Sequence, residues 1–370
     1  MQKLISLISD TETRPTPQMR QAIANAEVGD EQRGEDPSVT LLQERVAELL
    51  GKEAALWFPG GTMCNFVAVR VHTQPADAVI CDRMAHIVRA ESAGIAMSSG
   101  VLLEHIPTER GIFTPAELDA ALSRLRTVGA PYGAPATLLC VEQTHNFGGG
   151  AVWSHEELAA VSRHARSNGL ATHMDGARLM NACTATGTSA AAFGSLVDSV
   201  WIDFTKGLGA PIGAVLAGSR DFIAEARRQK HIFAGAMRQA GIAAAGCLYA
   251  LDHHVERLVE DHANAQKLAT GLQAIDGIHV RTAVPESNMV FFTPALGGLT
   301  NREFLALLQE YGVRMGEVRG EIRAVTHLDV SPTDIDCALS AIRKIVDAAK
   351  KQKTSRPAAL APSLLAGYGY

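Results

Sequence analysis

Short apolar runs, most of them ending at or beside an acidic residue, restrict the fold of this chain more than any other feature. They occupy residues 54–58, 78–82, 137–142, 170–175 and 199–204. Between them lie stretches with helical spacing of apolar residues, as at residues 40–50 and 156–168, and a glycine follows each of these two. Strands that are buried on both faces and separated by helices predict a mainly parallel sheet with helices on both sides.

A second unit is indicated after a long helical stretch at residues 240–272. It contains strand-like runs at residues 288–292 and 322–326 and a helical pattern at residues 301–311. We therefore predict three parts, which are an N-terminal segment with a large ligand-binding domain at residues 1–245, a smaller α+β domain at 246–350 and a flexible tail at 351–370.

Composition restricts the partners of the chain. Its 370 residues are 47% hydrophobic and 20% charged with a net charge of −5, which does not indicate a surface for nucleic acid or for an anionic membrane. The six cysteines include no CxxC pair and no metal-ligand spacing, and the first residues do not form a secretory signal. We expect a cytoplasmic protein with reduced thiols and no bound metal.

Lys206 is the first candidate for chemistry because it lies in a glycine-rich turn, residues 204–213, directly after an apolar run. Desolvation lowers the pKa of a lysine in such a place, so the lysine can form a Schiff base, and the glycines let a flat cofactor approach the backbone. This segment alone leaves a second interpretation open, which is a surface lysine in a flexible loop.

Asp175 ends the apolar run upstream of Lys206. Ligands of parallel sheets bind beyond the carboxyl ends of the strands, where this aspartate falls. It could pair with the protonated pyridine nitrogen of pyridoxal 5′-phosphate (PLP), a pairing that keeps PLP an electron sink. Taken alone, it could equally cap the next helix.

Other segments add weaker signals. Gly60-Gly61-Thr62 leads from a strand into a helix and could hold a phosphate there, although it lacks the GxxxxGK[ST] spacing of a nucleotide site. His86 follows a strand and could stack on a flat ring, and His145 lies in a similar place, but either could be an ordinary loop histidine. Arg323, in a strand-like run, needs a carboxylate partner, which could be an internal acid or the carboxylate of a substrate.

Taken together, these segments resemble the L-threonine aldolase family of PLP enzymes. The matches follow one another in order from about Ser9 to about Asp336, at residues 9–11, 28–30, 34–37, 50–55, 61–63, 85–86, 144–146, 175–178, 206–211, 237–239, 288–289 and 325–329. The resemblance implies an α/β protein of PLP fold type I, with a mainly parallel seven-stranded sheet between helices and a smaller C-terminal α+β domain.

The resemblance also implies roles for individual residues. Lys206, His86 and Asp175 would be catalytic, because they hold the cofactor as a Schiff base, stack on its ring and pair with its ring nitrogen. The implied cofactor-binding residues are Gly61, Thr62, His86, Asp175, Arg178, Lys206 and Arg238, the last reaching the phosphate of a neighbouring subunit. The candidate substrate-binding residues are Ser9, Arg33, His145, Arg178 and Arg323.

Three positions depart from the family pattern: Gly60 replaces a serine or threonine, Arg33 replaces a tyrosine, and Tyr132 stands about where close relatives carry a loop histidine. Arg33 could pair with a local acid, such as Glu31, Glu35 or Asp36, and only shape the loop. It could instead contact an anionic side chain of the substrate, as in β-hydroxyaspartate.

The implied reaction is aldol cleavage of an L-β-hydroxy-α-amino acid, such as L-threonine or L-allo-threonine, to glycine and an aldehyde. The alternatives are β-elimination, cleavage of another substrate such as phenylserine, transamination, and a PLP-fold protein that only binds. The expected assembly is a homodimer or homotetramer with shared active sites.

Overall fold

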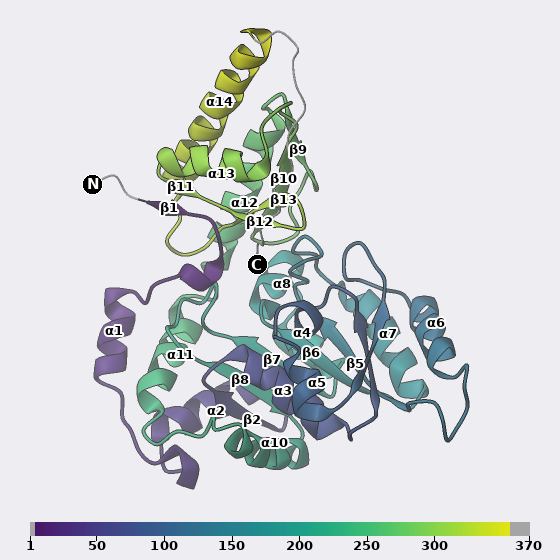
Figure 1. The fold of residues 1–370 in the computed structure, drawn as a ribbon. Helices are drawn as coiled ribbons and strands as arrows, with labels where there is room; N and C mark the ends of the chain where they lie inside the picture. The colour runs from purple at the N-terminus through teal and green to yellow at the C-terminus, as the bar shows by residue number, and fades with distance from the viewer. Residues whose placement is uncertain (1–3, 356–370) are drawn as a thin grey trace.

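The computed structural model describes residues 4–355, and its central element is a seven-stranded sheet (Figure 1). Its strands run in the order β2 (Ala54–Phe58), β8 (Ala214–Gly218), β7 (Ser199–Asp203), β6 (Ala171–Gly176), β5 (Ala136–Glu142), β3 (Ala78–Asp82) and β4 (Leu102–Ile106). Strand β8 runs antiparallel to both of its neighbours, β2 and β7, and the remaining neighbouring strands pair in parallel. The predicted mainly parallel sheet is therefore confirmed.

Alternate residues of the strands pack on opposite faces of this sheet. On β3, Val79 and Cys81 join one apolar cluster, whereas Ile80 joins another on the opposite face. The first face is covered by α3 (Gly61–His72), α5 (Gly94–Ser99) and α10 (Arg220–Ile232). The opposite face is covered by α2 (Pro37–Leu50), α6 (Pro115–Leu125), α7 (His155–Ser167), α8 (Leu179–Thr186), α9 (Ala190–Ser195) and α11 (Gly241–His253), and α1 (Pro17–Ala24) packs against α11.

A second apolar cluster lies around a four-stranded antiparallel sheet. The strands run in the order β12 (Gly316–Val318), β13 (Glu321–Val325), β10 (Met289–Pro294) and β9 (Ile278–Val280), with helices α12 (Leu258–Gln273), α13 (Asn301–Glu310) and α14 (Pro332–Ser355). Strand β1 (Ile5–Ser6) pairs with β11 (Val313–Arg314) in this part of the molecule, so Ile5 and Leu7 belong to the second cluster (Figure 1). The division into domains at residue 245 stays a prediction.

Some boundaries differ from those predicted. The helical stretch at residues 240–272 is two helices, α11 and α12, and between them His254 Nδ1 donates a 2.6 Å hydrogen bond to the carbonyl oxygen of Leu208. Helix α14 continues to Ser355, into the expected tail, and the rest of that tail lies outside the described residues. No helix within residues 4–355 has both the length and the apolar character needed to cross a membrane.

A buried ion pair joins the N-terminal region to the sheet. Lys230 Nζ of α10 lies 2.7 Å from Glu31 Oε1, in the short 3₁₀ helix Glu31–Arg33, and both side chains are buried. The ammonium group also lies over the rings of Trp57 and Phe58, at 5.1 and 5.6 Å from their centroids. Removing one partner would therefore leave a buried, uncompensated charge.

We predict that Lys230→Met lowers the free energy of unfolding by about 3–5 kcal/mol, the usual cost of breaking a buried pair from one side. The double variant Glu31→Leu/Lys230→Met should recover much of this loss, because it removes both charges. Urea denaturation measures both, with Arg45→Met as the control, since the Arg45–Asp252 pair is exposed and should contribute less than about 1 kcal/mol. A double variant no more stable than Lys230→Met would contradict the prediction.

Candidate active site

Acidic side chains collect at the carboxyl edge of the large sheet. Asp82 ends β3, Glu142 ends β5 and Asp203 ends β7, while Asp175 is the penultimate residue of β6. The sheet register places Asp175 beside Glu142 on one side and beside Trp201 on the other. This edge is where the sequence predicts the ligand site.

Asp175 is a buried carboxylate with two hydrogen-bond donors. Asn65 Nδ2 donates to its Oδ2 at 2.8 Å, and the backbone N–H of Ala177 donates to its Oδ1 at 3.1 Å. Burial, together with the charge of Glu142, raises the pKa of Asp175 to about 6, although the charges of His86 and Lys206 oppose this. A cationic ring nitrogen placed here would therefore meet a carboxylate that lacks a full counter-charge.

His86 begins the short helix α4 (His86–Arg89), next to Asp175. Its backbone N–H donates to Glu142 Oε2 at 2.8 Å, and its ring Nδ1 lies 2.9 Å from Glu91 Oε1. Burial opposes protonation of the ring, but the hydrogen bond that His86 donates to Glu91 and the charges of Asp175, Glu142 and Glu91 outweigh it and raise the pKa of His86. A small cavity lined by His86, Glu142, His173 and Asp175 adjoins the ring.

Lys206 lies on the turn that follows β7. Its Nζ is 3.2 Å from Asp203 Oδ2 and 5.8 Å from the centroid of the Trp201 ring, with 14% of the side chain exposed. The Thr13 hydroxyl donates to the carbonyl oxygen of Lys206 at 2.9 Å, which ties this turn to the N-terminal segment. The lysine is thus held at the same edge as Asp175, on the turn after the adjacent strand.

The N-terminus of α3 provides a place for an anion. Gly60 caps this helix with an extended backbone and no side-chain hydrogen bond, so the first N–H groups remain available, and Thr62 is exposed beside them. A Cβ atom at Gly61 would overlap the ring of Trp201, so only glycine fits at this position. Trp201 thus lies next to both features: its ring packs against Gly61 at the helix start, and it is the neighbour of Asp175 in the sheet.

Arg178 and Asp10 form a buried bidentate pair. Arg178 Nε and Nη2 donate to the two oxygens of Asp10, both at 2.7 Å, and Asn288 Nδ2 donates to Asp10 Oδ2 at 3.1 Å. Burial alone would raise the pKa of Asp10, but the charge and hydrogen bonds of Arg178 dominate and hold it well below its usual range. The N-terminal segment, through Asp10, therefore fixes the position of the Arg178 side chain.

Arg323 of β13 reaches the same region without a bond to a carboxylate. Its Nη1 donates to Asn146 Oδ1 at 2.8 Å and its Nη2 to the carbonyl oxygen of Ile8 at 3.1 Å, while Nε has no hydrogen-bond partner among the described residues. Burial and the charge of Arg178 lower its pKa to about 10. Of the two partners expected for Arg323, a substrate carboxylate is the one that this arrangement leaves available. Ser9, next to Ile8, caps a 3₁₀ helix through its hydroxyl oxygen.

His145 is fully buried and turned into the protein. Its Nδ1 accepts from the backbone N–H of Gly148 at 3.0 Å, and its Nε2 lies 3.3 Å from Asp82 Oδ1 and 3.7 Å from Glu142 Oε2. Both ring nitrogens therefore face protein groups, which does not favour the expected direct contact with a substrate.

Arg33 and Arg238 lie together on the surface around Asp30. Arg238 Nη1 donates to Asp30 Oδ2 at 2.8 Å, and Arg33 Nε lies 3.9 Å from the same oxygen. The side chain of Arg238 is 59% exposed and that of Arg33 is 72% exposed. Arg33 thus pairs with a local acid, Asp30, as one of the two interpretations expects. Of the acids named as examples, Glu31 is paired with Lys230 and Asp36 caps α2.

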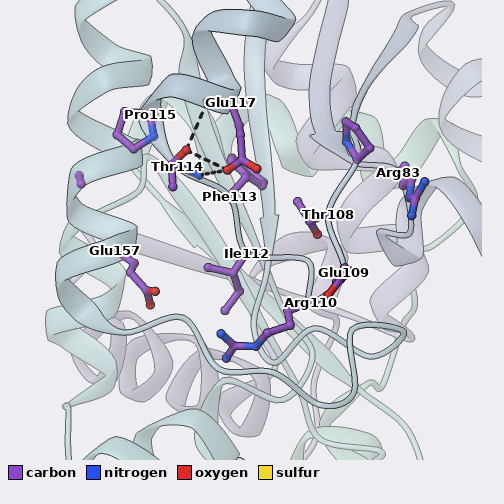
Figure 2. Close-up of a pocket in the computed structure, with 12 residues that line it drawn as sticks. Arg83, Thr108, Glu109, Arg110, Ile112, Phe113, Thr114, Pro115, Glu117 and Glu157 are labelled. Carbon is purple, nitrogen blue, oxygen red and sulfur yellow. Dashed lines mark hydrogen bonds between the residues drawn. The ribbon is translucent and has the colours of Figure 1, made fainter. Parts of the chain in front are cut away.

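A separate cavity of about 540 Å³ opens between α6 and α7 (Figure 2). Arg83, Thr108, Arg110 and Glu157 are among the residues that line it, and Thr114 forms a capping box with Glu117 at its wall. None of the candidate catalytic or cofactor-binding residues lines this cavity.

The residues at the site that were given no role from the sequence include Asp10, Asn65, Glu91 and Glu142. Asp10 pairs with Arg178, Asn65 with Asp175, and Glu91 and Glu142 with His86. The only sequence signal available for them was position, since Glu142 ends a predicted strand and Asp10 and Asn65 lie in or next to matched segments.

The residues present fit PLP. Three features lie at one edge of the sheet: a buried carboxylate for a ring nitrogen, a lysine on the turn after the adjacent strand, and an uncapped helix start next to a required glycine. One possible ligand atom from each of His86, Glu91 and Asp175 lies within 4.8 Å of the other two, a spacing that a metal ion could use. These atoms are instead hydrogen-bonded to one another or to Asn65.

Comparisons with known proteins agree with this geometry. A family model described as Beta-eliminating lyase matches residues 6–295. Low-specificity L-threonine aldolase 1 of Arabidopsis thaliana is 37% identical over 92% of this chain and 96% of its own length. The low specificity L-threonine aldolase of Escherichia coli (strain K12) is 37% identical over 89% and 95%. A threonine aldolase structure from Leishmania major has a similar fold, with a TM-score of 0.80 at 22% identity over 92% of this chain and 99% of that one.

We predict that Gly61→Ala displaces Trp201 and destabilises the cofactor-free protein by about 1–3 kcal/mol, the usual cost of overpacking. Gly60→Ala is the matched control, because a Cβ atom there meets nothing within 4 Å and its backbone is extended. Thermal unfolding and tryptophan fluorescence measure both variants. Equal behaviour of the two variants would show that Trp201 does not require glycine at position 61.

Proposed function

This chain belongs to the beta-eliminating lyase family, and within it we propose that the protein is a PLP-dependent lyase that cleaves L-β-hydroxy-α-amino acids, such as L-threonine or L-allo-threonine, to glycine and an aldehyde. The observation that carries the proposal is the placement of Lys206 and Asp175 at the ends of two adjacent strands. It is supported by relatives named L-threonine aldolase, which match this chain over nearly its whole length.

Bound PLP supplies the electron sink for the electrons of the Cα–Cβ bond that breaks. Lys206 would hold it covalently, and Asp175 would keep the proton on its ring nitrogen, because Asn65 and the Ala177 N–H stabilise the carboxylate. Gly61 and Thr62 would hold its phosphate at the start of α3. His86 would lie against its ring.

Arg323 would orient the substrate. Its unpartnered Nε and its two terminal nitrogens form a planar fork that matches a carboxylate, and Ser9 lies next to Ile8, whose carbonyl oxygen accepts from Arg323. Arg178, which follows strand β6 and is held by Asp10, would face the cofactor and the substrate. Cleavage also requires a group that takes the proton of the β-hydroxyl, and the nitrogen Nε2 of His86 is available, since Nδ1 is bound to Glu91.

A second reaction, β-elimination, is kept because the family description itself names it. Both reactions use the same electron sink and differ in the bond that breaks.

Within aldol cleavage, the side chain of the preferred substrate is a separate question, and Arg33 could favour a substrate with an anionic side chain. The exposed Arg33 and Arg238 cluster supports a role for both residues at the boundary with another subunit, in a homodimer or homotetramer with shared sites. A cytoplasmic location is part of the same proposal.

A panel of L-threonine, L-allo-threonine, phenylserine and β-hydroxyaspartate tests the proposed function. With PLP present, we expect glycine and the matching aldehyde in equal amounts. Release of ammonia and 2-oxobutanoate from threonine would indicate β-elimination instead.

Arg33→Tyr is tested on the same panel. If Arg33 contacts the substrate side chain, the ratio of kcat/KM for β-hydroxyaspartate and threonine should shift toward threonine by ~10-fold, and if Arg33 is structural, kcat/KM should change equally for all substrates.

We predict that Arg323→Lys weakens glycine binding by about 2–4 kcal/mol without releasing PLP, because lysine cannot form a bidentate contact to a carboxylate. Glycine titration, read from the absorption spectrum of the bound cofactor, measures the affinity. Arg319→Lys, on the exposed turn after β12, is the control and should bind glycine as the wild type does. Unchanged glycine affinity in Arg323→Lys would assign the carboxylate to another residue.

A further inference from the structure

Glu91 is a buried acid with an unusual set of contacts. Its side chain is fully buried, and its Oε1 lies 2.8 Å from Asn65 Nδ2 and 2.9 Å from His86 Nδ1. Its other oxygen, Oε2, is buried and has no hydrogen-bond partner among the described residues. A buried polar atom without a hydrogen-bond partner is costly, so the position of this side chain between His86 and Asn65 needs an explanation.

The orientation of the Asn65 amide follows from Trp201. The Trp201 indole Nε1 lies 2.8 Å from Asn65 Oδ1, and an indole N–H can only donate. The amide oxygen therefore faces Trp201, and the amide NH₂ faces the two carboxylates of Asp175 and Glu91, each at 2.8 Å. One amide group thus binds the acid proposed for the cofactor and the acid that contacts His86.

The rest of this network is neutral. His173 Nε2 lies 3.2 Å from the same Asn65 oxygen, so it carries the proton, and His173 Nδ1 accepts from the Ser199 hydroxyl at 2.8 Å. The Ser199 oxygen then accepts from His72 Nε2 at 2.8 Å. Burial lowers the pKa of His173 to about 3 and that of His72 to about 4, so neither adds a positive charge near the acids.

The hydrogen bond between Glu91 and His86 determines which nitrogen of the neutral His86 ring carries the proton. The amide NH₂ of Asn65 donates to Glu91 Oε1, and a carboxylate can only accept, so the proton between the Glu91 carboxylate and His86 belongs to Nδ1 of the imidazole. Nε2 is then the ring nitrogen with a free lone pair. Three acids face this ring from three elements: Glu91 from the turn after α4, Glu142 from β5 and Asp175 from β6.

We propose that Glu91, held by Asn65, is a positioning residue that fixes the proton of His86 on Nδ1 and so presents Nε2 to the substrate as the proton acceptor. This inference rests on the proposed function, because it names the group that receives the β-hydroxyl proton. A glutamine would serve a merely structural role equally well, since its amide oxygen could accept from both Asn65 and His86. The carboxylate adds charge, which makes Nε2 more basic.

Glu91→Gln tests this directly, because it keeps the shape and the acceptor oxygen but removes the charge. Exchange of the histidine C2 hydrogens with deuterium, followed by mass spectrometry across a range of pH, gives the pKa of His86 in the full chain with and without PLP. We expect the pKa of His86 to fall by ~1 unit or more, as expected for the loss of a close opposite charge. In threonine cleavage, the acid limb of the kcat profile should move to lower pH with it, and kcat should fall ~10-fold with little change in KM.

Asp119→Asn is the matched control, because Asp119 Oδ1 lies 2.6 Å from Nε2 of the surface His164, in a comparable acid–histidine pair. It should change the exchange of His164 and leave His86 and kcat unaltered. Glu91→Leu, which removes both the charge and the acceptor, should lower kcat further than Glu91→Gln. If Glu91→Leu does not fold, Glu91→Gln still decides the matter.

An unchanged pKa of His86 in Glu91→Gln would overturn the proposal, as would a shifted pKa without any shift in the kcat profile. The exchange measurement does not require turnover. A shifted His86 in a protein that cleaves none of the β-hydroxy amino acids would therefore overturn the proposed function while supporting the effect of Glu91 on His86.

Discussion

The hydrogen bond from Asn65 to Asp175 lies where the parallel sheet concentrates buried negative charge. Asp82, Glu142, Asp175 and Asp203 all lie at the carboxyl ends of neighbouring strands, and burial there makes each uncompensated charge costly. The protein stabilises these acids with donors from several elements, including Asn65, the N–H of His86 and the ammonium group of Lys206. A cationic ring nitrogen would compensate the buried negative charge of Asp175, and this compensation is the physical basis of the proposed cofactor site.

The N-terminal segment connects the two halves of the site. Ile5 and Leu7 pack with the small antiparallel sheet, while Asp10 binds Arg178 beside the large one. Between them, the carbonyl oxygen of Ile8 accepts from Arg323, and further along the Thr13 hydroxyl donates to the carbonyl of Lys206. One short stretch of chain thus fixes the groups proposed to bind the substrate relative to those proposed to bind the cofactor.

Much of this could be predicted from local patterns, and the rest could not for a physical reason. Apolar runs located β2, β3, β5, β6 and β7, and their polar ends located Asp175, because both signals lie within a few neighbouring residues. The roles of Asp10, Asn65 and Glu91 depend on partners that only the fold brings near, such as Asp10 with Arg178. The antiparallel β8 and the break at His254 likewise depend on tertiary contacts, the latter with Leu208.

The protonation state of the ring nitrogen of bound PLP tests the central claim of this account most directly. Nitrogen-15 NMR of the protein reconstituted with ring-labelled PLP reports whether that nitrogen carries a proton. The account predicts a protonated nitrogen at neutral pH in the wild type and an unprotonated one in Asp175→Asn. An unprotonated nitrogen in the wild type, or a protonated one in both proteins, would contradict the role given to Asp175.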